Sequence, residues 1–107
     1  MSSITVQEHV LLHLSQYSNR RPNVYNMPFA VTQDGIAEAL GISRAHVSLE
    51  LKKLKDNGRV SSILAHTPRA KRKRRTYYLQ PRGRSAVPKI NERMVIAKIG
   101  IAETAEA

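Results

Sequence analysis

The residues with the clearest chemistry in this sequence are the cations of the run RAKRKRR at residues 69–75. Six of these seven residues are basic: Arg69, Lys71, Arg72, Lys73, Arg74 and Arg75. Ammonium and guanidinium groups donate charge-assisted hydrogen bonds to phosphate and carboxylate oxygens. Residues 1–19 contain no Lys or Arg, so the positive charge of the chain is concentrated. Such clustering favours a dedicated element that binds a polyanion over a general solubility device.

A second set of candidate contact residues lies on a helix predicted over residues 43–57. At about 100° per residue, one face of this helix and its first turn combine short side chains with cations. Small residues let a helix approach base edges closely, and Arg or Lys then donates to guanine or phosphate. An ordinary amphipathic helix with a solvated basic face explains the same pattern. The candidate residues are Ser43, Arg44, Ala45, His46, Ser48, Leu49 and Lys52.

The elements that position this face are two helices joined by a short turn within residues 32–58. Thr32 and Ser43 have hydroxyl groups that can cap the two helices. Gly41 and Gly58 tolerate the left-handed backbone that ends a helix. The second helix carries one apolar stripe, formed by Val47, Leu51 and Leu54. The turn at residues 41–43 is so short that the helices must cross sharply, as in a helix-turn-helix.

The flanking segments predict a further helix and a β-hairpin. Residues 5–17 have helical apolar spacing and begin with the capping box Thr5-x-x-Glu8. A long connection over residues 18–31 follows, in which Val24-Tyr25 or Phe29-Ala30-Val31 can add a third strand. Strands are then predicted over Arg59–His66 and Thr76–Leu79, with the basic run at the tip between them. The apolar members of the first strand are Val60, Ile63 and Leu64.

The C-terminal part of the chain predicts an additional helix. Pro81 and Gly83 mark an irregular segment over residues 81–88, and helical spacing resumes over residues 89–107. We therefore expect a domain over residues 1–88 and a C-terminal helical segment over residues 89–107. Many aliphatic residues gather there, after the core of a small domain is complete: Ile90, Met94, Val95, Ile96, Ile99 and Ile101. Dimerisation, packing back on the same domain, and connection to a further domain each account for them.

Enzymatic and metal chemistry finds little support in the sequence. The five glycines form no phosphate-binding loop, and cysteine is absent. His9 and His13 share a helix face, but no third ligand has an evident place, so partly exposed surface histidines explain them better than a metal. We expect no catalytic residues, no metal and no cofactor. No apolar run reaches membrane-spanning length and the N-terminus has no signal-peptide pattern, which predicts a soluble, cytoplasmic protein without membrane contact.

Two stretches resemble a known superfamily. ALGISRAHVSLELKKLKDNGRV resembles the helix-turn-helix of winged-helix transcription factors, and TYYLQPRGR resembles the line that closes their wing. The resemblance covers roughly residues 5–87 and includes archaeal members. It implies a mainly α fold with a small β-hairpin (α+β), a winged helix-turn-helix with an extra C-terminal helix. It makes residues 43–57 the recognition helix and residues 67–75 a wing that touches the DNA backbone or minor groove.

These observations together predict a sequence-selective regulator that binds double-stranded DNA. The net charge of +10 agrees with a polyanionic partner. We also expect a homodimer formed through residues 89–107 and the first helix. Three alternatives stay open: a winged helix that binds RNA or a ribonucleoprotein, an interaction module without nucleic acid, and the DNA-binding part of a longer multidomain protein. The low aromatic content of 5% disfavours RNA, whose readers usually offer stacking platforms.

Overall fold

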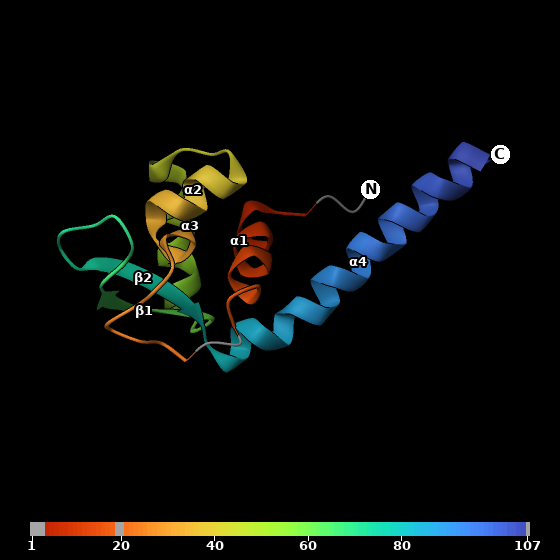
Figure 1. Cartoon of the computed structure of the whole chain (residues 1–107). Coiled ribbons are helices and arrows are strands. Elements are labelled where there is room, and N and C mark those ends of the chain that lie inside the picture. Colours follow the sequence, from red (N-terminus) through yellow and green to blue (C-terminus); the bar gives the residue numbers. More distant parts are fainter. Residues whose placement is uncertain (1–3, 19–20, 107) are drawn as a thin grey trace.

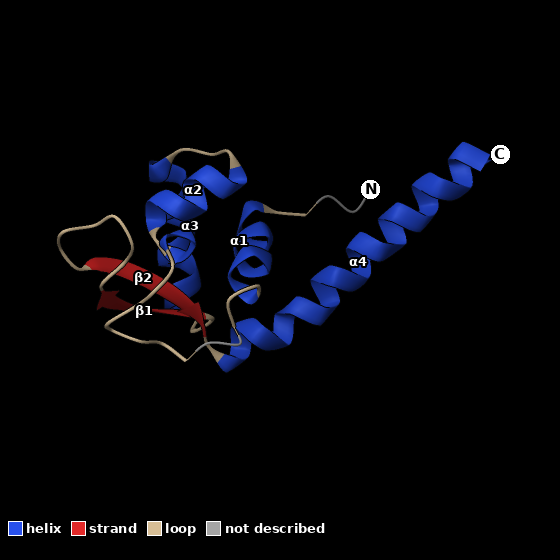
Figure 2. Ribbon diagram, viewed as in Figure 1, coloured by secondary structure: helices blue, strands red, loops and turns tan. Residues whose placement is uncertain are grey.

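The computed structural model describes residues 4–18 and 21–106, with side chains up to residue 94. Within these residues the order of elements is α1 (Val6–Ser15), the 3-10 helix η1 (Phe29–Val31), α2 (Gln33–Leu40), α3 (Arg44–Asp56), β1 (Val60–Ala65), β2 (Arg74–Leu79) and α4 (Pro81–Glu106) (Figure 1). Three helices pack together beside an antiparallel hairpin, and α4 leaves from its end (Figure 2). The mainly α fold expected from the sequence, a winged helix-turn-helix with an extra C-terminal helix, is confirmed.

The helix ends follow the capping signals in the sequence. Thr5 and Glu8 form both hydrogen bonds of a capping box at the start of α1. Thr32 Oγ1 accepts from the Gly35 N–H at 3.0 Å and thereby caps α2. Gly41, with φ at 68°, ends α2 in the left-handed conformation that glycine adopts at little cost. These local interactions fix where α1 and α2 begin and where the turn before α3 falls.

The hydrophobic core lies between α1, α2, α3 and one face of the hairpin. Leu51 and Leu54 of α3 are almost fully buried, as their spacing predicts. Leu64 lies in β1, as predicted, but its side chain is 56% exposed, and Ala65 is buried instead. The core is formed by Val10, Leu11, Leu14, Met27, Val31, Ile36, Ala37, Val47, Leu51, Leu54, Val60, Ala65, Tyr77, Leu79 and Ile90.

The connection before α2 forms no third strand among the described residues. Phe29–Val31 is a 3-10 helix, so its expected extended conformation is wrong. The backbone of this connection nevertheless contacts both outer edges of the hairpin. His66, directly after β1, donates to the Val24 carbonyl and accepts from the Met27 N–H, each at 2.9 Å. Thr32 forms an isolated antiparallel bridge with Thr76 on the outer edge of β2.

Helix α4 begins eight residues earlier than the sequence predicted. It starts at Pro81, a residue whose fixed φ suits the first turn, and continues through Pro88. The expected helix start at residue 89 is therefore wrong, and the expected boundary at residue 88 falls inside a continuous helix. Gly83 is buried because α4 packs against the chain after α3: a Cβ there would lie 2.2 Å from the Arg59 carbonyl oxygen.

The first half of α4 belongs to the core of the domain. Ile90 is only 3% exposed, and the Arg93 guanidinium forms an ion pair with Glu8 of α1. The second half runs away from the body (Figure 1). The radius of gyration is accordingly 15.3 Å, against about 13 Å for a compact chain of this length. In the described part of the chain, no helix combines the length and the apolar composition needed to cross a membrane.

We predict that Ile90→Ala destabilises the domain by about 2–5 kcal/mol, because it removes buried methyl groups and leaves a cavity between α4 and the core. Urea unfolding followed by circular dichroism measures this change. Lys89→Ala, at the exposed neighbouring position, is the control and should change stability by less than about 0.5 kcal/mol. Equal stability of the two variants would mean that α4 contributes nothing to the core.

Candidate nucleic-acid interface

Helix α3 presents one face to solvent because its other face is anchored in the core. Val47, Leu51 and Leu54 are at most 1% exposed. This burial fixes the rotation of the helix about its axis. All seven residues expected on the recognition surface are at least partly exposed: Ser43, Arg44, Ala45, His46, Ser48, Leu49 and Lys52. The apolar Leu49 is 52% exposed, which leaves its side chain available for contact with a thymine methyl group.

Two of these residues also have roles within the helix. Ser43 Oγ accepts from the His46 N–H at 3.1 Å and caps α3. His46 Nε2 lies 3.8 Å from Glu50 Oε1, and Lys53 Nζ lies 3.5 Å from the same oxygen. Glu50 is 8% exposed, so its carboxylate faces the protein side of the helix. Glu50 therefore adds no negative charge to the face that carries Ala45, Ser48 and Lys52.

The six cations of the basic run divide between the hairpin loop and its second strand. Arg69, Lys71, Arg72 and Lys73 lie in the loop, whereas Arg74 and Arg75 belong to β2. The second strand therefore begins at Arg74 and not at the predicted Thr76, because the ladder pairs Arg74 with Ala65 and Arg75 with Leu64. All six cations are exposed. The backbone turns at Arg69, whose φ of 68° is unusual for a residue other than glycine.

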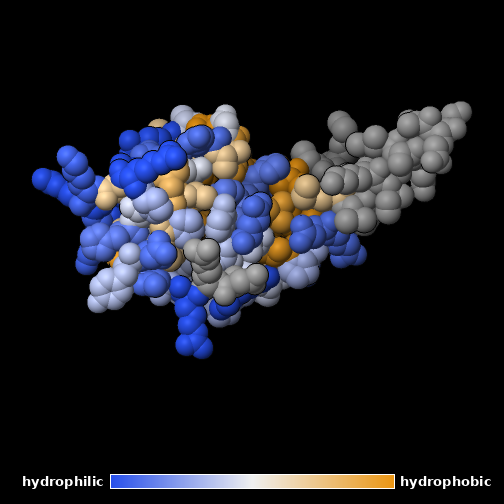
Figure 3. All heavy atoms as spheres, in the orientation of Figure 1, coloured by the Kyte–Doolittle hydropathy of each residue, from blue (hydrophilic) through white to orange (hydrophobic). Residues whose placement is uncertain are grey.

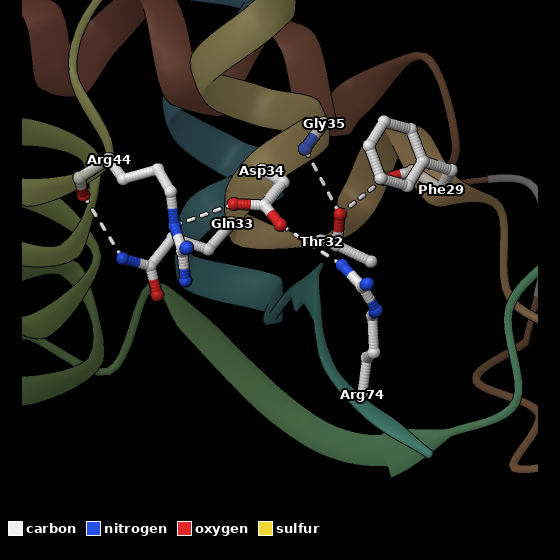
Figure 4. Close-up of polar contacts among 7 residues, drawn as sticks. All are labelled: Phe29, Thr32, Gln33, Asp34, Gly35, Arg44 and Arg74. Atoms are coloured by element: carbon white, nitrogen blue, oxygen red, sulfur yellow. Dashed lines mark hydrogen bonds and ion pairs between the residues drawn. The ribbon is translucent and has the colours of Figure 1, made fainter. Parts of the chain in front are cut away.

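Asp34 of α2 connects α3 to the β-hairpin. Its Oδ1 lies 2.6 Å from Arg44 Nε, and its Oδ2 accepts a hydrogen bond from Arg74 Nη1 at 3.0 Å (Figure 4). Oδ1 is buried and accepts no hydrogen bond of regular geometry from the described residues, so Arg44 balances it chiefly as a charge. One carboxylate therefore holds two candidate contact residues from different elements. Asp34 was not among the site residues predicted from the sequence.

The neighbours of Asp34 fix its position. Gln33 Nε2 donates to the Arg44 carbonyl at 3.0 Å, which ties the first turn of α3 to α2 (Figure 4). The Thr32 hydroxyl donates to the Phe29 carbonyl at 2.6 Å. Gly35 has no space for a side chain, because a Cβ would lie 2.1 Å from the Phe29 carbonyl oxygen. The start of α2 is thus held between η1 and α3.

Tyr77 of β2 is not available as a free stacking platform. Tyr77 is 7% exposed and belongs to the core. Burial raises the pKa of Tyr77, and the nearby Arg75 guanidinium partly offsets this rise. Figure 3 shows hydrophilic side chains over the hairpin loop and the adjacent body, while apolar side chains are most evident where α4 leaves the body.

The histidine pair on α1 does not form a metal site with other described residues. The His13 ring nitrogen Nε2 lies 2.8 Å from the Ala30 carbonyl oxygen, which places this histidine in a contact between α1 and the η1 segment. His9 is exposed. Among the described residues, no group of three His, Cys, Asp or Glu side chains is placed to hold a metal ion.

Comparison with known proteins identifies the domain. The family model of the Crp-like helix-turn-helix domain matches residues 9–67, more than half of the chain. The chain belongs to this family. The match includes most of α1, both helices of the helix-turn-helix and β1 of the Crp-like domain. A search of curated proteins gives no significant match.

Several solved structures share the winged-helix arrangement of this Crp-like domain. MepR of Staphylococcus aureus, solved in complex with DNA, superposes with a TM-score of 0.70 at 20% identity, over 91% of this chain and 60% of that chain. A transcription regulator of the MarR family gives 0.66 at 21% identity, over 97% and 59%. A point mutant of Lactococcus lactis ZitR gives 0.61 at 25% identity, over 99% and 62%. The chain spans less than two thirds of the length of these proteins.

Proposed function

We propose that this protein is a sequence-selective, double-stranded DNA-binding regulator of transcription. The recognition helix, residues 43–57, enters the major groove, and the wing, residues 67–75, contacts the backbone or minor groove. The chain acts without a cofactor, in the cytoplasm and on the nucleoid. The observation that carries the proposal is the pairing of Arg44 in α3 and Arg74 in β2 with one carboxylate, which joins the two contact elements into one surface.

Several properties support this proposal over its alternatives. An exposed helix face with small residues and cations suits a major groove, which admits an α-helix. The structurally similar proteins include MepR in complex with DNA and other transcription regulators. Those similarities also disfavour an enzyme. RNA binding remains the second candidate because Tyr25 is 79% exposed and offers an aromatic face. The similar proteins are longer than this chain, which is consistent with the alternative that the chain is the DNA-binding part of a longer protein.

We further propose a homodimer formed by residues 89–107 with help from α1. Beyond Ile90, which packs in its own domain, the sequence of α4 contains Val95, Ile96, Ile99 and Ile101, whose side chains lie outside the described part. Burying such an aliphatic side chain stabilises an assembly by roughly 1.5–3 kcal/mol. A two-fold partner supplies an equivalent surface, and two symmetric recognition helices read half-sites about one helical turn apart.

The proposed function predicts preferential binding to duplex DNA. Selection of bound duplexes from a random pool should enrich a palindromic sequence, because each subunit of the dimer reads one half-site. Competition at matched salt should then show that structured RNA and single-stranded DNA displace the selected duplex poorly. Equal competition by structured RNA would contradict the regulator proposal and favour the RNA-binding alternative.

The wing and the recognition helix should have separable effects on binding. Arg72→Gln with Lys73→Gln should weaken binding to all duplexes and reduce the slope of log K against log salt by roughly 0.9 for each phosphate that these side chains no longer neutralise. Lys52→Ala should instead change the preference among sequences by about 1–3 kcal/mol if it contacts a base. Filter binding at four salt concentrations measures both quantities.

Two control variants match these substitutions. Arg84→Gln with Lys89→Gln removes the same charges from exposed positions of α4 and should leave the salt slope within error. Lys55→Ala removes a lysine of α3 whose Nζ hydrogen-bonds to Ser62 Oγ at 3.1 Å, and it should leave sequence preference unchanged. A wing variant with the wild-type slope would show that the loop cations stay solvated when DNA binds.

Truncation after Met94 tests the dimer, since it retains Ile90 and the Arg93–Glu8 ion pair. The full chain should sediment as a dimer, and the truncated chain as a folded monomer with much weaker binding to the palindrome. Circular dichroism verifies the fold of the truncated chain. A full chain that stays monomeric at high micromolar concentration, with and without DNA, would exclude the dimer and favour a connector role for residues 89–107.

A further inference from the structure

The carboxylate of Asp34 differs from that of an ordinary surface ion pair because it contacts two arginines from different elements. The two arginines, Arg44 and Arg74, are the first residues of α3 and β2. Arg74 lies forty positions after Asp34 in the sequence. An isolated exposed ion pair contributes only about 0–1 kcal/mol to stability. Stability alone therefore does not explain why one acid lies between two arginines of the candidate interface. The pairing instead fixes where these arginines lie relative to each other.

The atoms used in the contacts make the arrangement informative. Arg44 faces Asp34 with Nε, so both terminal nitrogens of its guanidinium remain without a partner among the described residues. Those two nitrogens are the pair that arginine uses for bidentate contacts with guanine or with a phosphate. The Arg44 side chain is 69% exposed, whereas that of Asp34 is 32% exposed. Asp34 thus holds the inner edge of the guanidinium and leaves its outer edge for a ligand.

The backbone of Arg44 is held by the residue next to Asp34. Gln33 Nε2 donates to the Arg44 carbonyl at 3.0 Å, so two successive residues of α2 fix both the main chain and the side chain of Arg44 (Figure 4). Restricting an arginine in this way reduces the conformational entropy that it loses on binding. The restriction also limits the directions from which a base edge or phosphate can approach the guanidinium.

The charge of Asp34 has a second effect. Two arginines without a neighbouring acid attract any polyanion, whatever its sequence. A carboxylate within 3.0 Å of both cancels part of this attraction. The acid therefore lowers the affinity for DNA of any sequence. Because it also orients the arginines, the affinity that depends on base contacts is retained.

We propose that Asp34 is the positioning residue that sets the selectivity of DNA binding, by orienting Arg44 and Arg74 and reducing their attraction for non-cognate nucleic acid. This inference rests on the proposed function. A purely local role also exists for Asp34, because an acid in the first turn of α2 interacts favourably with the helix dipole. That local role predicts altered stability with equal effects on all duplexes, so the ratio of cognate to non-cognate affinity separates the two.

The test compares Asp34→Asn with Glu38→Gln in the full chain. Glu38 lies one turn further along α2, is exposed and forms no ion pair with the described residues, so its variant makes the same charge change. Filter binding measures affinity for the selected duplex and for a scrambled duplex at four salt concentrations. Asp34→Asn should bind the scrambled duplex several-fold more tightly, with a steeper salt slope, and the affinity ratio should fall about tenfold. Glu38→Gln should keep the wild-type ratio.

Further variants make the result decisive. Asp34→Glu keeps the charge but displaces the carboxylate, so it should retain the wild-type salt slope and lose part of the affinity ratio. If circular dichroism shows that Asp34→Asn does not fold, Asp34→Glu replaces it as the test variant. In an Arg44→Ala, Arg74→Ala background, Asp34→Asn should leave the ratio unchanged. A wild-type ratio in both Asp34 variants would overturn the inference. Absence of any preferred duplex for the wild-type chain would instead overturn the proposed function.

Discussion

Burial of three aliphatic side chains of α3 determines which residues this protein presents. Val47, Leu51 and Leu54 enter the core between α1, α2 and the hairpin, and they leave α3 no freedom to rotate about its axis. The exposed face then follows from the geometry of the helix. The same constraint directs Glu50 toward Lys53 and away from the exposed face of the helix. An amphipathic pattern thus decides both the stability of the domain and the chemistry of its surface.

Local sequence signals predicted most of the helix-turn-helix because its determinants are close in sequence. The caps Thr32 and Ser43 and the left-handed Gly41 act within four residues of their own positions. The start of α4 was missed because Pro81 and Gly83, taken alone, indicate an irregular segment. In the structure, the close approach of the Arg59 carbonyl requires a residue without a side chain at position 83. Tertiary contact decided there against local propensity.

The candidate interface was predictable in composition but not in its internal connections. The exposed cations of α3 and the hairpin were evident from charge clustering and helical periodicity. The pairing of Asp34 with Arg44 and Arg74 depends on the crossing of α2 over α3 and on the register of the hairpin, neither of which has a signal near residue 34. Arg44 and Arg74 therefore differ from the neighbouring cations of the sequence in that they share a carboxylate partner.

The backbone contacts along the hairpin have a consequence for solubility. A two-stranded sheet has two outer edges whose unpaired amide and carbonyl groups can template pairing with another chain. Here Thr32 occupies the edge of β2 at Thr76, while Val24 and Met27 occupy the chain at His66, just beyond β1. The connection between α1 and α2 thus blocks both edges at one point each. A segment without regular strand structure therefore hinders edge-to-edge pairing of the hairpin with another chain. The exposed side chain of Leu64 on β1 is an apolar surface that this segment does not cover.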